Sequence, residues 1–132
     1  MTFEIINPEE LGAPKGWNNG LLAPPGGRIL FVAGQTARDE EGRIVDGGFA
    51  AQFERALANM LTVVRAAGGS AENVARLTVF ITDRATYLES RRALGEVWRR
   101  QMGLHYPAMT LVEVAALVDE GAMVEVEATA VV

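Results

Sequence analysis

The spacing of apolar residues predicts two helices. From Phe49 to Ala67, apolar side chains recur every three or four positions, which is the period of a helix with one buried side. The stripe consists of Phe49, Phe53, Leu57, Met60 and Val64. The polar side consists of Gln52, Arg55, Asn59 and Thr62. Gly68 and Gly69 are expected to end this helix, and a second one is predicted for about residues 86–102.

Shorter apolar runs predict strands on both sides of these helices. They cover residues 3–6, 28–34, 74–82, 109–116 and 122–131. In the last run Val124, Val126 and Ala128 alternate with polar residues, so one face would be apolar and the other would carry Glu125 and Glu127. The segment 39–43 is expected to form a hairpin-like turn.

The order of these elements predicts an α+β fold. Two strands, a helix, a strand, a helix and two further strands fit a mixed sheet with both helices packed on one face. A chain this short leaves the opposite face of the sheet uncovered. We therefore expect the protein to associate with itself.

Composition narrows the class of protein. The 132 residues, 49% of them apolar, suffice for one buried core, so we expect a single soluble domain over residues 1–132. The absence of cysteine excludes a disulfide framework or a thiolate metal site, and together with the lack of a signal peptide it suits a cytoplasmic protein. No run of residues is apolar enough for a membrane span. The net charge of −5 and the scattered arginines argue against nucleic-acid binding.

Several short motifs occur in an informative order. They are Phe31-Val32-Ala33-Gly34-Gln35, the helix with Gln52 and Asn59, Val79-Phe80-Ile81-Thr82-Asp83, Tyr106-Pro107-Ala108-Met109-Thr110 and Val124-Glu125-Val126-Glu127-Ala128. Together they resemble the RidA/YjgF family of imine deaminases, also called endoribonuclease L-PSP. The resemblance implies a chorismate-mutase-like α+β fold. It also implies a homotrimer whose sheets form a central barrel, with small-molecule clefts between subunits.

The resemblance also implies a reaction. Members with the full pattern hydrolyse enamines or imines: an arginine holds the substrate carboxylate, and a glutamate activates water. The glutamate corresponds to Glu125 and is the expected catalytic residue. The arginine position is Met109, which cannot make a charge-assisted hydrogen bond, so efficient use of 2-aminoacrylate is not expected.

Three further cleft positions that the resemblance implies differ from the full pattern, among them Leu111 in place of a frequent cysteine. Trp17 replaces a tyrosine and Ala33 replaces a serine. Gly34 would allow close approach of a ligand, and Thr110 adjoins the arginine position. Arg91, on the second helix, could bring a guanidinium back from another direction. The expected ligand is therefore more apolar than a small amino-acid derivative.

No cofactor is expected. The chain lacks phosphate-cradling and dinucleotide-binding glycine motifs. Its single histidine, His105, has no neighbouring ligands at metal-binding spacing, so we expect it at the surface or in an interface.

Three functions remain open. The first is a divergent deaminase or related hydrolase that cleaves a C=N or C–N bond through Glu125. The second is a non-catalytic trimer that binds or senses a small metabolite. The third is an endoribonuclease, which the lack of a basic patch disfavours.

Overall fold

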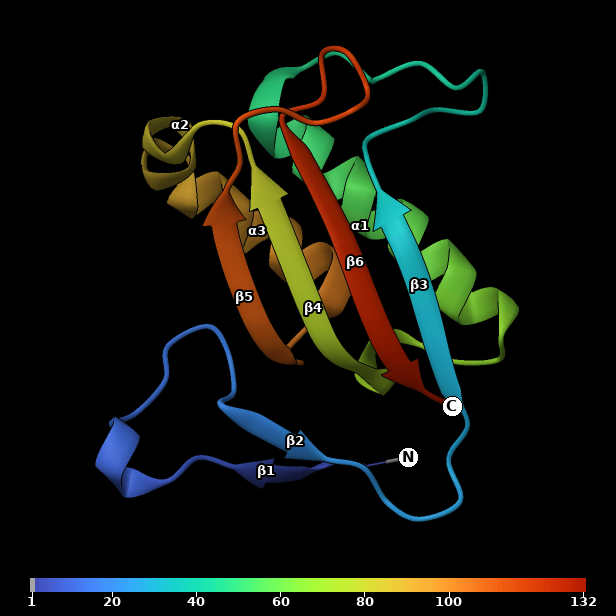
Figure 1. The fold of residues 1–132 in the computed structure, drawn as a ribbon, viewed down its shortest axis with the longest axis vertical. Helices are drawn as coiled ribbons and strands as arrows, with labels where there is room; N and C mark the ends of the chain where they lie inside the picture. Colours follow the sequence, from blue (N-terminus) through green and yellow to red (C-terminus); the bar gives the residue numbers. More distant parts are fainter. Residues whose placement is uncertain (1) are drawn as a thin grey trace.

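The computed structural model describes residues 2–132 as a four-stranded sheet with helices on one face (Figure 1). The strands are β1 (Glu4–Ile6), β2 (Gly20–Leu22), β3 (Ile29–Gln35), β4 (Val74–Ile81), β5 (Ala108–Glu113) and β6 (Val124–Val131). The helices are α1 (Gly48–Ala66), α2 (Arg84–Glu89) and α3 (Arg91–Met102), with single 3-10 turns at Glu9–Leu11 and Ala71–Asn73. The predicted arrangement of a mixed sheet with helices on one face is confirmed.

The sheet has the order β3-β6-β4-β5, in which only the β4–β5 pair is parallel. β1 and β2 form a separate antiparallel hairpin, which lies below the sheet in Figure 1. Helix α1 ends as predicted, because Gly68 adopts a left-handed conformation (φ 90°) and Gly69 N–H bonds back to the Val64 carbonyl.

The core lies between the sheet and α1 and α3. The inward-facing residues of β6 are buried, which confirms the predicted alternation, and Leu57, Met60, Leu77 and Val126 are among the fully buried side chains. Helices cover one side of the sheet only. No other element of residues 2–132 covers the opposite side, which we call the open face.

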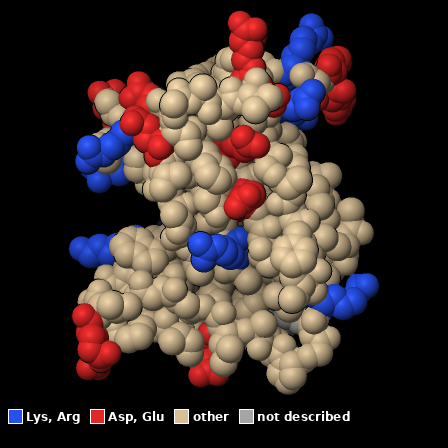
Figure 2. Space-filling view, viewed as in Figure 1, with Lys and Arg blue, Asp and Glu red and all other residues tan. Residues whose placement is uncertain are grey.

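The open face is seen from the front in Figure 2, where most of the surface is uncharged and acidic groups gather toward the top. Its side chains include Phe31, which is 77% exposed, and the residues around a hollow of about 170 Å³. That hollow is lined by Phe31, Val32, Arg76, Thr78, Glu127, Ala128 and Thr129.

Three details differ from the sequence expectations. The second helix is divided at Ser90, whose backbone (φ −96°, ψ 2°) ends α2 and whose hydroxyl donates to the Thr86 carbonyl. Strand β2 was not predicted, because the glycine-rich residues before it mask its pairing with β1. Gln52, assigned to the polar side of α1, is buried with 5% exposure and hydrogen-bonded.

A charged contact joins α1 to α3. Arg100 Nη2 donates to Glu54 Oε1 (2.8 Å), Arg100 Nε donates to Glu54 Oε2 (3.0 Å), and Gln101 also donates to this carboxylate. The hydrogen bonds from Arg100, and then that from Gln101, lower the pKa of Glu54 from 4.5 to about 2. The pair remains solvent-accessible, with Arg100 57% and Glu54 30% exposed, so screening limits its contribution to stability.

We predict that Glu54→Gln lowers the melting temperature by a few degrees at pH 7 and that this difference disappears in acid. A depressed carboxyl pKa contributes stability above the unfolded value, and that contribution is lost as the pH falls from about 4.5 to about 2. Thermal unfolding of both proteins across this range is the measurement, with Glu89→Gln as the control at an exposed position. A difference that is constant with pH would contradict the assignment.

Candidate functional site

The backbone at Gly34 lies directly against the carboxylate of Glu125. A Cβ atom added at position 34 would overlap Glu125 Oε1 and would lie 3.0 Å from Glu125 Cδ. Only a residue without a side chain leaves the carboxylate in this place. The group that lies against Gly34 within the chain is thus the carboxylate of the predicted catalytic glutamate, and the predicted approach of a ligand at Gly34 stays a prediction.

A β-bulge produces this proximity. Val32 pairs with Ala128 and Gln35 pairs with Val126, so Ala33 and Gly34 together stand opposite one residue, Glu127. Such an extra residue bends the strand locally, and bulges commonly redirect side chains at functional sites. We call Ala33, Gly34 and Glu125 the glutamate half-site.

Glu125 is half-buried on the open face and pairs in register with Phe80 of β4. Within residues 2–132, no group donates a hydrogen bond to its carboxylate. A carboxylate with free acceptor positions beside an aromatic ring can accept a proton from a water or a ligand.

Trp17 precedes Asn18, which bridges to the start of the edge strand β5, and this strand carries Met109 and Thr110; we call Trp17, Met109 and Thr110 the β5 half-site. Asn18 fixes the loop to the strand: its N–H donates to the Pro107 carbonyl (3.2 Å) and its Nδ2 donates to the Tyr106 carbonyl (2.6 Å). The neighbouring Trp17 is 42% exposed. Its indole is therefore available to contact a ligand at the β5 edge.

Strand register places Met109 and Glu125 on opposite faces of the sheet within one chain. Met109 pairs with Leu77, which pairs with Ala128, and Met109 packs against the core on the helix side of the sheet. Glu125 lies on the open face, where Thr110 also points. Since side chains alternate between the faces, Met109 and Glu125 of one chain cannot point into the same space.

Arg91 is brought to neither half-site by any recorded contact. It is exposed at the start of α3, and its Nε donates to the Leu88 carbonyl of α2 (3.2 Å). The guanidinium thus binds the end of the preceding helix. Its compensating role stays a prediction.

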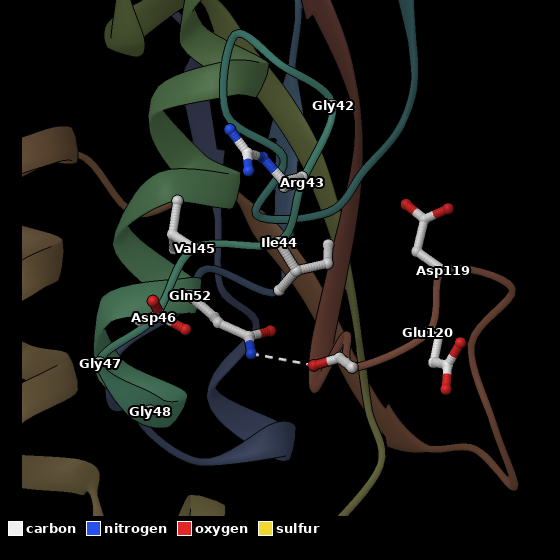
Figure 3. Close-up of a pocket in the computed structure, with 11 residues that line it drawn as sticks. Gly42, Arg43, Ile44, Val45, Asp46, Gly47, Gly48, Gln52, Asp119 and Glu120 are labelled. Atoms are coloured by element: carbon white, nitrogen blue, oxygen red, sulfur yellow. Dashed lines mark hydrogen bonds between the residues drawn. The ribbon is translucent and has the colours of Figure 1, made fainter.

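A cavity of about 530 Å³ lies between the loops that follow β3 and precede β6 (Figure 3), which are at the upper end of the sheet in Figure 1. Its lining comes from residues 42–48, from Gln52 and from residues 119–121, and includes none of the predicted site residues. Gln52 points toward the 119–121 loop and donates a hydrogen bond to the Gly121 carbonyl (Figure 3). Sequence reasoning missed this role, although a polar residue directly before Phe53, at the edge of the apolar stripe, was a usable signal.

The described part of the chain contains no candidate metal centre. Among residues 2–132, no three His, Cys, Asp or Glu side chains are grouped so that they could hold an ion. His105 is half-buried, stacks on Phe3 and places Nε2 2.7 Å from the Val74 carbonyl. Nor is any helix in this part of the chain long and apolar enough to cross a membrane.

Comparison with known proteins places this geometry in context. The family model described as Endoribonuclease L-PSP matches residues 10–132. A RutC family protein of Pyrococcus abyssi is 34% identical over 98% of both chains. The human protein named 2-iminobutanoate/2-iminopropanoate deaminase is 31% identical over 79% of this chain and 73% of its own length.

A solved structure resembles the whole chain. The Yersinia pestis protein YyfB, described as a Rid family protein of unknown function, has a TM-score of 0.86, with 29% identity and complete coverage of both chains. The fold class expected from the sequence is thereby confirmed.

We predict that Gly34→Ala displaces the Glu125 carboxylate and costs about 0.5–1.5 kcal/mol, since the side chain must leave its preferred rotamer. The loss should vanish in a Glu125→Ala background, which denaturant unfolding of the two single variants and the double variant would show. Gly95→Ala is the matched control: its Cβ meets open space on α3, and it should stabilise by about 0.5–1 kcal/mol. An equal loss with and without Glu125 would contradict the proposed crowding.

Proposed function

The chain belongs to the RidA/YjgF family, also described as endoribonuclease L-PSP, and from this membership we propose that it hydrolyses the C=N bond of a small imine. The main support for the proposal is the Glu125 carboxylate, which lies beside Gly34 and accepts no hydrogen bond from residues 2–132. Relatives named 2-iminobutanoate/2-iminopropanoate deaminase support imine deamination as the general activity.

Glu125 has a defined role in this reaction. Its carboxylate accepts a proton from water as the water oxygen bonds to the carbon of the protonated imine, and the C=N π electrons move to nitrogen, which gives a neutral carbinolamine. The protonated carboxyl then returns the proton to the amino group of the carbinolamine. The C–N bond breaks, ammonia leaves with the electron pair, and the hydroxyl proton is lost as the ketone forms.

A second copy of the chain completes the site in this proposal. The open face is uncovered and carries Phe31 at 77% exposure, and Met109 and Glu125 lie on opposite faces of the sheet within one chain. In a homotrimer, the β5 half-site of one copy would meet the glutamate half-site of its neighbour. The ligand would then bind between subunits.

Met109 determines the proposed substrate preference. A thioether offers no partner for a carboxylate, whereas a guanidinium would form a bidentate pair with one. Trp17 adds aromatic surface at the β5 edge. The favoured substrate is therefore an imine with a bulky apolar or aromatic side chain, and we propose a cytoplasmic location for this activity.

A non-catalytic binding protein is the alternative that the same cleft allows. A fully paired Glu125 would have favoured it, but the carboxylate accepts no hydrogen bond from residues 2–132. No observation favours ribonuclease chemistry, because the single histidine, His105, is bound to the Val74 carbonyl.

We predict that the protein releases ammonia faster from the imine of L-phenylalanine than from that of L-alanine, each generated in place by an amino-acid oxidase. Glu125→Gln should lower kcat at least about 100-fold, the scale of general acid–base assistance. Met109→Arg should raise kcat/KM for the alanine-derived imine roughly 10-fold or more, because a hydrogen bond to a charged group contributes about 1.5–3 kcal/mol. Full activity of Glu125→Gln would refute the mechanism.

The assembly has its own test. We expect light scattering to give a trimer and Phe31→Asp to give a monomer, since a charge on the open face opposes burial of that face. Val63→Asp is the control, because Val63 is exposed at 36% on α1, on the far side of the sheet. A monomeric wild-type protein would contradict the shared cleft.

A further inference from the structure

Two side-chain amides on α1 hold the chain on both sides of the glutamate half-site. Gln52 and Asn59 are seven residues apart and so lie two turns apart on the same side of the helix. Each binds backbone groups of a different loop. The two loops are the ones that lead out of β3 after Gly34 and into β6 before Glu125.

Gln52 holds the loop before Glu125. Its Nε2 donates to the Gly121 carbonyl (3.0 Å, Figure 3), and its Oε1 accepts from the Met123 N–H (2.8 Å). Gln52 is only 5% exposed. A buried amide that both donates to and accepts from the backbone fixes the position of that segment, because a broken bond there leaves a buried polar group unpaired.

Asn59 holds the loop after Gly34 in a similar way. Its Nδ2 donates to the carbonyls of Thr36 (3.0 Å) and Arg38 (2.9 Å). Its Oδ1 accepts from Arg55 Nε (3.1 Å), which leaves the amide nitrogen facing the loop. These three hydrogen bonds together hold the Asn59 amide in one orientation.

A third contact ties the two loops to each other. Thr36 Oγ1 donates to Asp119 Oδ2 (2.5 Å), and Thr36 is 5% exposed. The segments after Gly34 and before Glu125 are thus linked directly as well as through α1. Thr36 and Met123, which are held by this network, stand two residues from Gly34 and Glu125 respectively.

We propose that Gln52 and Asn59 are positioning residues that set where the Glu125 carboxylate lies against the backbone at Gly34. Their catalytic effect rests on the function proposed above, whereas their geometric effect does not. Held points two residues away lie only about 7 Å along a strand, so a small loop displacement reaches the carboxylate. Misplacement by about 1 Å can lower a rate about 100-fold.

The first test is kinetic, with the phenylalanine-derived imine as the probe. Gln52→Met keeps the side-chain length but removes both hydrogen bonds, and we expect kcat to fall about 10- to 100-fold while KM changes little. Asn59→Ala should act in the same direction. Gln101→Met is the matched control, because the Gln101 amide bonds only to Glu54, between α1 and α3.

The second test needs no activity. In an otherwise wild-type background, Glu125→Gln should shift the NMR resonances of Gly34, since the two residues are in contact. We expect this response to fall at least twofold in a Gln52→Met background and in an Asn59→Ala background. In a Gln101→Met background it should be unchanged.

The outcomes distinguish the positioning role of Gln52 and Asn59 from the proposed imine hydrolysis. The positioning role is overturned if the NMR response of Gly34 is unchanged in both the Gln52→Met and the Asn59→Ala backgrounds. It is also overturned if kcat of these variants matches that of the Gln101→Met control. Should Gln52→Met fail to fold, Asn59→Ala decides, since Asn59 is less buried than Gln52. Active Glu125→Gln protein with a weakened Gly34 response would refute the proposed function and leave the positioning role standing.

Discussion

The contact between the Glu125 carboxylate and the backbone at Gly34 is the constraint on which the site depends. It requires a bulge in β3, because regular pairing would not place two residues, Ala33 and Gly34, opposite Glu127. It also requires a residue without Cβ at position 34. No group of residues 2–132 donates a hydrogen bond to the carboxylate, and its strand partner is aromatic, Phe80. These are the conditions that proton transfer needs.

Alternation along the strands determines how the rest of the site is built. The same period of two that buries Val124 and Val126 sends Glu125 to the open face. On β5 it turns Met109 toward the helices. Met109 and Glu125 therefore lie on opposite faces of the sheet within one chain, and in the proposed assembly a neighbouring copy brings the two kinds of group together. The proposed catalytic cleft therefore depends on assembly of the subunits.

Much of the fold was predictable from local pattern. The apolar stripe of α1 and the alternation in β6 each follow from burial on one side, so their periods gave the elements to within a few residues. The break at Ser90 was missed, because α2 ends there without a glycine or proline, with the Ser90 hydroxyl donating to the Thr86 carbonyl. Within the site, Glu125 and Gly34 were named from motifs, and the structure places them in contact. The role of Gln52 was not predicted, because its hydrogen bonds reach a loop about 70 residues away in sequence.

A subunit-complementation experiment tests directly whether each cleft combines Glu125 of one copy with Trp17 of the next. Glu125→Gln and Trp17→Glu, each expected to be inactive alone on the phenylalanine-derived imine, are co-expressed and their mixed trimers assayed. If each cleft takes Glu125 from one copy and Trp17 from the next, every mixed trimer contains one unaltered cleft, and about a quarter of wild-type activity returns on random mixing. If both residues of a working site come from the same chain, no mixed trimer contains an unaltered site. Activity that stays at the level of the single variants would then contradict a cleft shared between subunits.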